Sequence, residues 1–352
     1  MRADIIAAVK QGTIAIVQLR HRADFMRRRC GWLRLSPLAL LALLSGCSGH
    51  QLRLLHPGGP IAATSLRLTV IDVLIMLCII LPTIIFVAIS LWRFRAARKA
   101  SYDPGFTHSV RLEVLMWGVP FAAVAALAYF SWRGVFLVNP YAPTALGQRK
   151  SLLAMPDRPG TGNPLVIDVV ATDWQWLFIY PDQHIATLNT LSLPAGRNIE
   201  FRLTATDVVN DFYIPQLIGM IDVMPGMRTK DMMRADRPGV WQGFSADISG
   251  AGFSWMQFPT RVMTQAGFAA WVAKTQAAPR HLDYARFRSI ARPTIDLRGV
   301  TRNFSAVQPH LFSRIVHAAM KGATDTTPMF LTEHMRRDLA RRAPYLSGYP
   351  HS

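Results

Sequence analysis

The chain has 352 residues, of which 51% are hydrophobic, and its 39 basic and 21 acidic residues give a formal net charge of +18. The apolar residues gather in a few runs, which excludes a single soluble globule of this length. Basic residues are scattered and no nucleic-acid-binding module accompanies them, so no nucleic-acid partner is expected. The composition therefore favours a membrane protein.

The N-terminal region has the features of a cleaved secretory signal. Arginines 27 to 29 precede the apolar stretch LSPLALLALLSGC, which is too short to span a bilayer comfortably, and Met26 is an alternative start of the protein. Leu44, Ser45, Gly46 and Cys47 resemble the bacterial lipoprotein box, whose cysteine is acylated. We expect residues 1–46 to be a lipoprotein-type signal peptide with lipid on Cys47. The other interpretation is an apolar run that ends in cysteine by chance.

Two later apolar runs are long enough to cross a bilayer. Residues 68–92 would form a helix of about 37 Å, and residues 112–132 form the second run, with Trp117 and Trp132 as interface anchors. The loop 93–111 between them carries five basic residues and one acid, so the positive-inside rule places it in the cytoplasm. The segment before the first span and everything after the second then lie outside the inner membrane.

The remainder of the chain divides into three parts. Residues 133–164 are rich in Pro, Gly and Ala and predict a linker. Residues 165–275 hold short β-type runs separated by turn residues, which predicts an all-β sandwich. Residues 276–352 predict a C-terminal extension that is helical, aromatic-rich and basic. The segment of residues 47–67 is expected on the outer face, next to the lipid anchor.

The stretch SADISGAGFSWM, from Ser245 to Met256, has the spacing of a copper site without its soft ligands. Three cysteines occur in the chain and none lies beyond Cys78, so the β region has neither a thiolate-bound metal nor an internal disulfide. Serine hydroxyls are hard neutral donors and phenylalanine has no donor atom. Met256 alone would therefore not retain copper.

Two spans followed by a β-sandwich with this motif resemble subunit II of the haem-copper respiratory oxidases, whose outer domain has the cupredoxin fold. In the cytochrome c oxidase branch, the family holds a dinuclear copper centre with a His and then Cys-x-x-x-Cys-x-x-x-His-x-x-Met. Four of these five donors are missing here, so the chain is similar to the quinol branch, ubiquinol oxidase subunit II. The positions that match these five ligands, which we call the copper-site frame, are Asn210, Ser245, Ser249, Phe253 and Met256.

Three further stretches carry the same resemblance to ubiquinol oxidase subunit II, so that it covers nearly the whole mature chain. They are DWQWLFIYPDQHIATLN (173–189), GFAAWVAK (267–274) and the aromatic-rich NFSAVQPHLFSRIV (303–316). The fold class implied is a membrane protein with two N-terminal transmembrane helices, an all-β cupredoxin-like sandwich and a C-terminal helical extension.

The resemblance implies that the haems, the copper and the oxygen chemistry belong to oxidase subunit I, and that this chain binds no cofactor. The partners implied are subunit I, further membrane subunits (III and IV), membrane lipid, and ubiquinol through the complex. Glu113 matches the family's glutamate at the mouth of a proton-uptake path; the alternative is an interface glutamate paired with Arg111 or a neighbour.

Two further positions match functional residues of the copper-bearing branch. Trp174 corresponds to the tryptophan that takes electrons from cytochrome c there, but with no copper behind it we expect a core or interface aromatic. Asp247 matches an acidic residue near a magnesium site, and by itself it predicts no metal binding. Two alternative functions stay open: a cytochrome c oxidase subunit II, and a membrane lipoprotein that scaffolds another complex.

Overall fold

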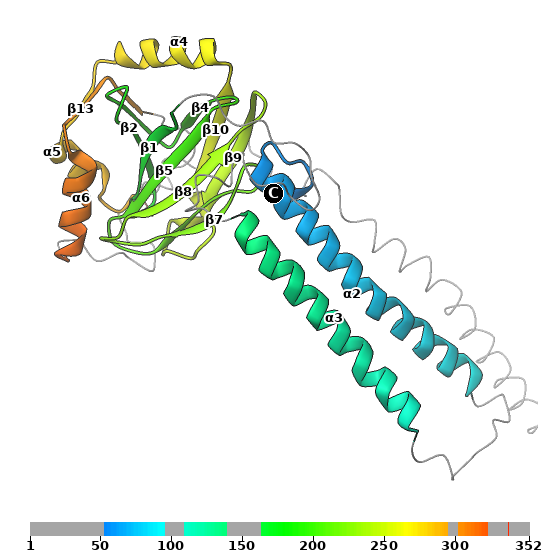
Figure 1. Ribbon diagram of the computed structural model, residues 1–352. Helices are drawn as coiled ribbons and strands as arrows, with labels where there is room; N and C mark the ends of the chain where they lie inside the picture. Colours follow the sequence, from blue (N-terminus) through cyan, green and yellow to red (C-terminus); the bar gives the residue numbers. More distant parts are fainter. Residues whose placement is uncertain (1–52, 96–108, 139–162, 295–301, 323–336, 338–352) are drawn as a thin grey trace, which may run out of the picture. The chain divides into compact units, whose positions relative to one another are not determined.

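The structure is a computed structural model that describes residues 53–95, 109–138, 163–294, 302–322 and 337 (Figure 1). The predicted signal peptide, Cys47, most of the predicted cytoplasmic loop and the basic C-terminal stretch lie outside the described residues.

Two long apolar helices precede the β domain. They are α2 (Pro60–Arg93) and α3 (Val110–Leu137), and both are long and apolar enough to cross a membrane. Gly134 of α3 packs against Leu68 of α2, where an added Cβ would lie 2.7 Å from a leucine methyl carbon. A residue without a side chain therefore lets the two helices approach closely at this point.

Both helices are longer than the predicted spans. The first begins at Pro60 rather than at residue 68, because a proline fits the first helical position, where its missing N–H has no helical partner to lose. The second continues to Leu137, into the predicted linker 133–164, because Val135 and Phe136 extend its apolar run. Residues 139–162 of that linker lie outside the described part of the chain.

The region after the helices is a sandwich of two sheets, which confirms the predicted all-β domain. One sheet has six strands in the order β12 (Arg302–Phe304), β3 (Ile185–Leu188), β2 (Trp176–Tyr180), β1 (Leu165–Ala171), β5 (Asn198–Ala205) and β8 (Thr229–Arg234). The other has five, in the order β4 (Leu191–Pro194), β10 (Gln257–Met263), β9 (Gly239–Ser245), β6 (Asn210–Ile214) and β7 (Ile218–Val223).

Parallel and antiparallel pairs are mixed in both sheets. The pairs β1–β5 and β4–β10 are parallel, whereas the other pairs within the two sheets are antiparallel. Parallel neighbours cannot be joined by a tight hairpin, so the chain passes between the sheets. It passes from β3 in one sheet to β4 in the other, and from β7 to β8 in the opposite direction.

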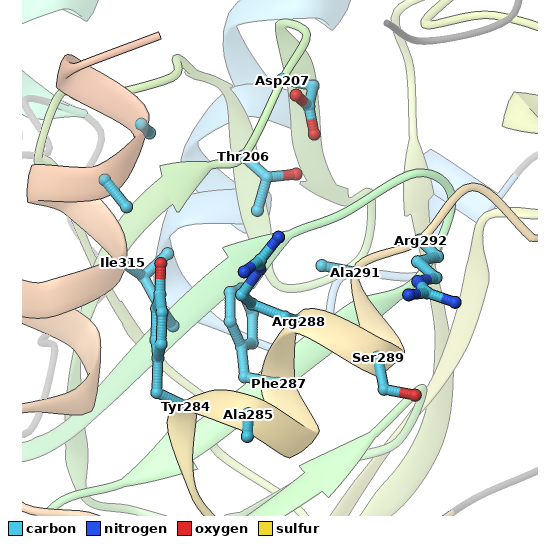
Figure 2. Close-up of a pocket in the computed structure, with 12 residues that line it drawn as sticks. Thr206, Asp207, Tyr284, Ala285, Phe287, Arg288, Ser289, Ala291, Arg292 and Ile315 are labelled. Carbon is cyan, nitrogen blue, oxygen red and sulfur yellow. The ribbon is translucent and has the colours of Figure 1, made fainter. Parts of the chain in front are cut away.

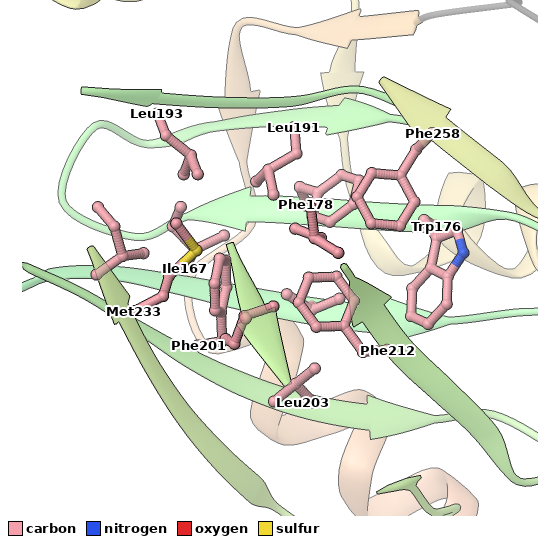
Figure 3. Close-up of a cluster of buried hydrophobic side chains, with 14 of the residues drawn as sticks. Ile167, Trp176, Phe178, Leu191, Leu193, Phe201, Leu203, Phe212, Met233 and Phe258 are labelled. Atoms are coloured by element: carbon pink, nitrogen blue, oxygen red, sulfur yellow. The ribbon is translucent and has the colours of Figure 1, made fainter. Parts of the chain in front are cut away.

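Aromatic side chains from both sheets fill the core between them (Figure 3). Phe212 and Phe258 stack with ring centroids 5.6 Å apart, and Trp176 meets both rings edge-on. Each such pair contributes about 0.5–1.5 kcal/mol beyond the burial of its apolar area. Phe178 and Phe201 complete this fully buried cluster.

The C-terminal extension contains more strand than its sequence predicted. After α4 (Gln265–Gln276), the chain forms a two-stranded pair, β11 (His281–Leu282) with β13 (Ala306–Val307), and two helices, α5 (Tyr284–Ile290) and α6 (Leu311–Met320). It also supplies β12, which pairs with β3 at the edge of the six-stranded sheet. A second apolar core lies between the outer face of this sheet and the extension. It includes Val170, Leu177, Ile179, Phe287, Phe304, Leu311, Phe312 and Ile315.

The start of α2 is attached to the β domain through two glycines. The amide of Gly58 donates to the carbonyl oxygen of Gln216 at 2.6 Å, and its own carbonyl accepts from Asp236 at 3.0 Å. A Cβ on Gly59 would lie 2.3 Å from the backbone oxygen of Arg234. Backbone approaches backbone here, and only glycine leaves room for it.

We predict that Gly59→Ala lowers the thermal unfolding midpoint of the full-length protein in detergent. The added methyl group has no flexible neighbour to displace, which corresponds to about 1–3 kcal/mol of overpacking. The matched control is Gly219→Ala, because a Cβ on Gly219 meets nothing within 4 Å. Equal midpoints for the two variants would show that the close approach at Gly59 does not matter.

Candidate functional site

The five positions of the copper-site frame lie together at one end of the sandwich. Asn210 begins β6 and Ser245 ends β9; both are buried. The other three follow in the loop that leads to β10, which contains the short helix η3 (Phe253–Trp255). Met256 is 1% exposed and belongs to the core of the sandwich.

Hydrogen bonds connect these positions in place of metal bonds. The Ser245 hydroxyl donates to Oδ1 of Asn210 at 3.2 Å and accepts from the amide of Asp211 at 3.4 Å. The Ser245 amide donates to the carbonyl oxygen of Met256 at 3.1 Å, and the Met256 amide donates to that of Phe253 at 2.9 Å. The loop therefore closes onto β6 through ordinary protein hydrogen bonds.

Two buried tryptophans hold the same loop: Trp176 in β2 of the six-stranded sheet, and Trp174 in the turn that precedes β2. The indole N–H of Trp174 donates to the carbonyl oxygen of Ser249 at 3.0 Å, and that of Trp176 donates to the carbonyl oxygen of Met256 at 3.3 Å. The Trp174 ring lies against Gly252, where a Cβ would be 2.3 Å from a ring carbon. The expectation that Trp174 is a core aromatic agrees with its exposure of 2%.

The donor atoms at the five positions do not fit a dinuclear copper centre. They are one amide, two hydroxyls and one thioether, with a phenyl ring at the fifth position, whereas a copper pair requires bridging thiolates and imidazoles. The Ser249 hydroxyl is buried without a hydrogen-bond partner among the described residues. Within the same part of the chain, no three His, Cys, Asp or Glu side chains are grouped closely enough to hold a metal ion.

A pair of carboxyl groups beside the frame was not predicted from the sequence. Asp211 and Asp222 lie directly opposite each other on β6 and β7. Burial, the hydrogen bond to Asp222 and the negative charges of Asp222 and Asp247 together raise the pKa of Asp211 to about 6. The signal exists only in the strand register, since 11 positions separate the two residues along the chain (222 − 211 = 11).

The proton-path candidate lies far from the frame in the sequence. Glu113 is exposed in the first turn of α3, and its amide donates to the carbonyl oxygen of Ser109 at 3.0 Å. A negative side chain near a helix N-terminus interacts favourably with the helix dipole. Glu113 thus occupies the end of α3 next to the basic loop, as predicted. The lipidation candidate, Cys47, is outside the described residues.

The extension forms two cavities that sequence reasoning missed. One, of about 630 Å³, lies between α5, α6 and the turn after β5; Figure 2 shows Arg288 and Arg292 on the α5 side and Thr206 with Asp207 on the other. The second, of about 330 Å³, lies over the outer face of the six-stranded sheet and is lined by Asp168 among others. Both depend on contacts between distant segments, which no local pattern reveals.

We predict that Asn210→Ala destabilises the outer domain, because the Ser245 hydroxyl would lose its acceptor in a buried position. The expected loss is about 1–3 kcal/mol of unfolding free energy, measured on the full-length protein by denaturant titration followed by tryptophan fluorescence. Ser254→Ala, at an exposed hydroxyl in the same loop, is the control and should be neutral. Indistinguishable midpoints would show that the hydrogen bond is not structurally important.

Comparison with known proteins identifies relatives over most of the chain. Residues 182–263 match the family "Cytochrome C oxidase subunit II, periplasmic domain". The cytochrome bo(3) ubiquinol oxidase subunit 2 of Pseudomonas putida is 36% identical over 80% of this chain and 83% of its own length. That of Pseudomonas aeruginosa is 35% identical over 83% of each chain. The ubiquinol oxidase subunit 2 of Acetobacter aceti is 35% identical over 80% of this chain and 87% of its own.

A solved structure of the periplasmic domain of subunit II of cytochrome oxidase from Bradyrhizobium japonicum is also similar. The two sequences are 23% identical, and the TM-score is 0.31. The match covers 33% of this chain and 95% of the Bradyrhizobium japonicum chain. The similarity to the ubiquinol oxidase subunits covers 80–83% of this chain. The chain belongs to the ubiquinol oxidase subunit II family of the haem-copper oxidases.

Proposed function

We propose that this chain is subunit II of a proton-translocating ubiquinol oxidase in an aerobic respiratory chain. Ubiquinol is oxidised by the complex and oxygen is reduced to water in the partner subunit I. The observation that carries the proposal is the donor set of the frame: residues with no affinity for a copper pair stand where the cytochrome c oxidase branch needs thiolates and imidazoles. Relatives named ubiquinol oxidase subunit 2 support the same assignment.

In this proposal the chain carries no redox centre of its own. Electrons reach subunit I from quinol dissolved in the lipid, so a relay from a soluble cytochrome is not needed. The buried indoles of Trp174 and Trp176 support this role, because both N–H groups are used to hold the loop around the frame. The outer domain then acts structurally, packing against subunit I together with further membrane subunits such as III and IV.

Membrane placement follows from the two apolar helices and the periplasmic-domain family. The chain lies in the bacterial inner membrane, with the β domain in the periplasm and the loop between α2 and α3 in the cytoplasm. After removal of residues 1–46, lipid on Cys47 anchors the new N-terminus at the outer face. Mass spectrometry of the mature N-terminus tests this, and an unmodified Cys47 would contradict it.

Glu113 assists proton uptake at the cytoplasmic mouth of a path into subunit I. Its place in the first turn of α3 supports this, since that end of the helix follows the basic loop. A carboxylate at this depth is unfavourable unless it is hydrated or paired. An alternative role, as a structural partner for a nearby arginine, predicts loss of stability rather than loss of rate.

Purification of the tagged chain from membranes should recover a multi-span haem protein with quinol-dependent oxygen uptake. Reduced cytochrome c should not support uptake by the same preparation. Recovery of the chain without any haem protein would favour the scaffolding lipoprotein, and rapid oxidation of cytochrome c would favour the copper-bearing branch.

Glu113→Gln should slow quinol-dependent oxygen uptake by about tenfold without loss of the assembled complex, because the amide cannot transfer a proton. Asp103→Asn, in the predicted cytoplasmic loop 93–111 that precedes α3, is the matched control and should keep the wild-type rate. Turnover at the wild-type rate in the Glu113 variant would refute the role in proton uptake. A reduced haem content with normal turnover per haem would instead indicate the structural role.

A further inference from the structure

The cavity over the six-stranded sheet lies where a charged and an apolar half of the sheet meet. One cross-strand row runs from Ala186 through Ile179, Asp168 and Arg202 to Lys230. The apolar members are covered by α6 and β12 of the C-terminal extension. Asp168 is the first charged residue of the row, at the edge of this cover, and it lines the cavity of about 330 Å³.

Asp168 is an unsatisfied acceptor in this cavity. The residue is 7% exposed, and its Oδ1 has no hydrogen-bond partner among the described residues. Arg202, directly opposite on β5, directs its Nε to Glu200 at 3.0 Å. A buried acceptor without a donor is costly, and a bound group with N–H donors would remove that cost. Burial raises the pKa of Asp168 to about 6, although the positive charges of Arg202 and Arg228 oppose this.

Whereas Asp168 needs a hydrogen-bond donor, the first turn of α6, which also lines the cavity, needs an acceptor. His310 is the N-cap residue, and no side chain caps this helix. At the start of the helix, the amide of Leu311 donates to the carbonyl oxygen of Gln308, and the amide of Arg314 donates to the carbonyl oxygen of His310. Arg228 adds a positive charge there, because its Nη2 donates to the Ser313 hydroxyl at 3.1 Å. An N-terminal turn beside a guanidinium favours an anionic group.

Charged side chains of both signs surround Asp168. Arg202 and Arg228 are positive, and Glu200 and Asp182 are negative, so their contributions to the potential at Asp168 oppose each other. A simple anion would be repelled by the Asp168 carboxylate. A simple cation would be repelled by the guanidinium groups and by the helix N-terminus. The surroundings therefore suit a ligand that carries both charges at separate ends.

We propose that this cavity binds a small zwitterion of the α-amino acid class, with its ammonium group at Asp168 and its carboxylate at the first turn of α6. The volume of about 330 Å³ is sufficient for a molecule of this size. His310 and His184, which also line the cavity, can donate to the carboxylate. The phosphoethanolamine headgroup of membrane lipids also carries an ammonium group and an anionic group at separate ends. The test below distinguishes this headgroup from a free amino acid.

The test is calorimetric titration of the full-length protein in detergent with L-alanine, acetate, ethylamine and phosphoethanolamine. L-alanine should bind saturably, and acetate and ethylamine, which each carry one of its charges, should bind at least about tenfold more weakly. If phosphoethanolamine binds more tightly than alanine, the zwitterion site is supported with a lipid source. Equal binding of acetate or ethylamine, or no saturation by either zwitterion, would overturn the proposal.

Asp168→Asn should weaken alanine binding by at least about tenfold, because the amide keeps the shape but loses the charge that pairs with ammonium. The matched control is Asp222→Asn, at an exposed carboxylate on β7 of the other sheet, which should change the affinity by less than about twofold. Unchanged affinity in the Asp168 variant would overturn the assignment. Should that variant not fold, the ligand series on the wild-type protein decides the matter alone.

Discussion

The hydrogen bonds that close the loop between β9 and β10 are the interaction on which the outer domain depends. Two indole N–H groups and the Ser245 hydroxyl satisfy buried groups of this loop and of β6. In the copper-bearing branch, the family frame places metal ligands at these positions. Here neutral donors and acceptors connect these positions, and such groups stabilise a fold but do not bind a redox metal. This agrees with the proposed function, in which the domain is a structural part of an oxidase whose electrons enter through a partner subunit.

Local patterns predicted the architecture well and the interfaces poorly. The two apolar runs and the alternating strands gave the helices and the sandwich, because period and length alone decide such elements. The start of α2 at Pro60 was missed, because the prediction followed the apolar run from residue 68 rather than the proline that fits the first helical position. Asn210 and Ser245, two positions of the frame, are joined by a hydrogen bond between β6 and β9. The pairing of Asp211 with Asp222 required the register of β6 and β7, which no single segment encodes.

The extension changes how the sandwich is protected. Strand β12 covers the edge of β3, and α6 covers apolar residues on the outer face of the sheet. The sequence suggested a helical tail, because β12 has only three residues and its pairing lies far away in the chain. This cover stops at Asp168, where it leaves a polar cavity. One face of the domain thus joins a second apolar core to a charged site, separate from the frame at the end of the sandwich.

We propose that this subunit serves a quinol-fed oxidase without a copper centre of its own. The most direct measurement is the copper content and visible spectrum of the purified full-length subunit after incubation with copper and removal of excess metal. Substoichiometric copper and no purple chromophore are expected, because the frame has no thiolate and no imidazole. Two tightly bound copper ions per chain that accept electrons from reduced cytochrome c would contradict it.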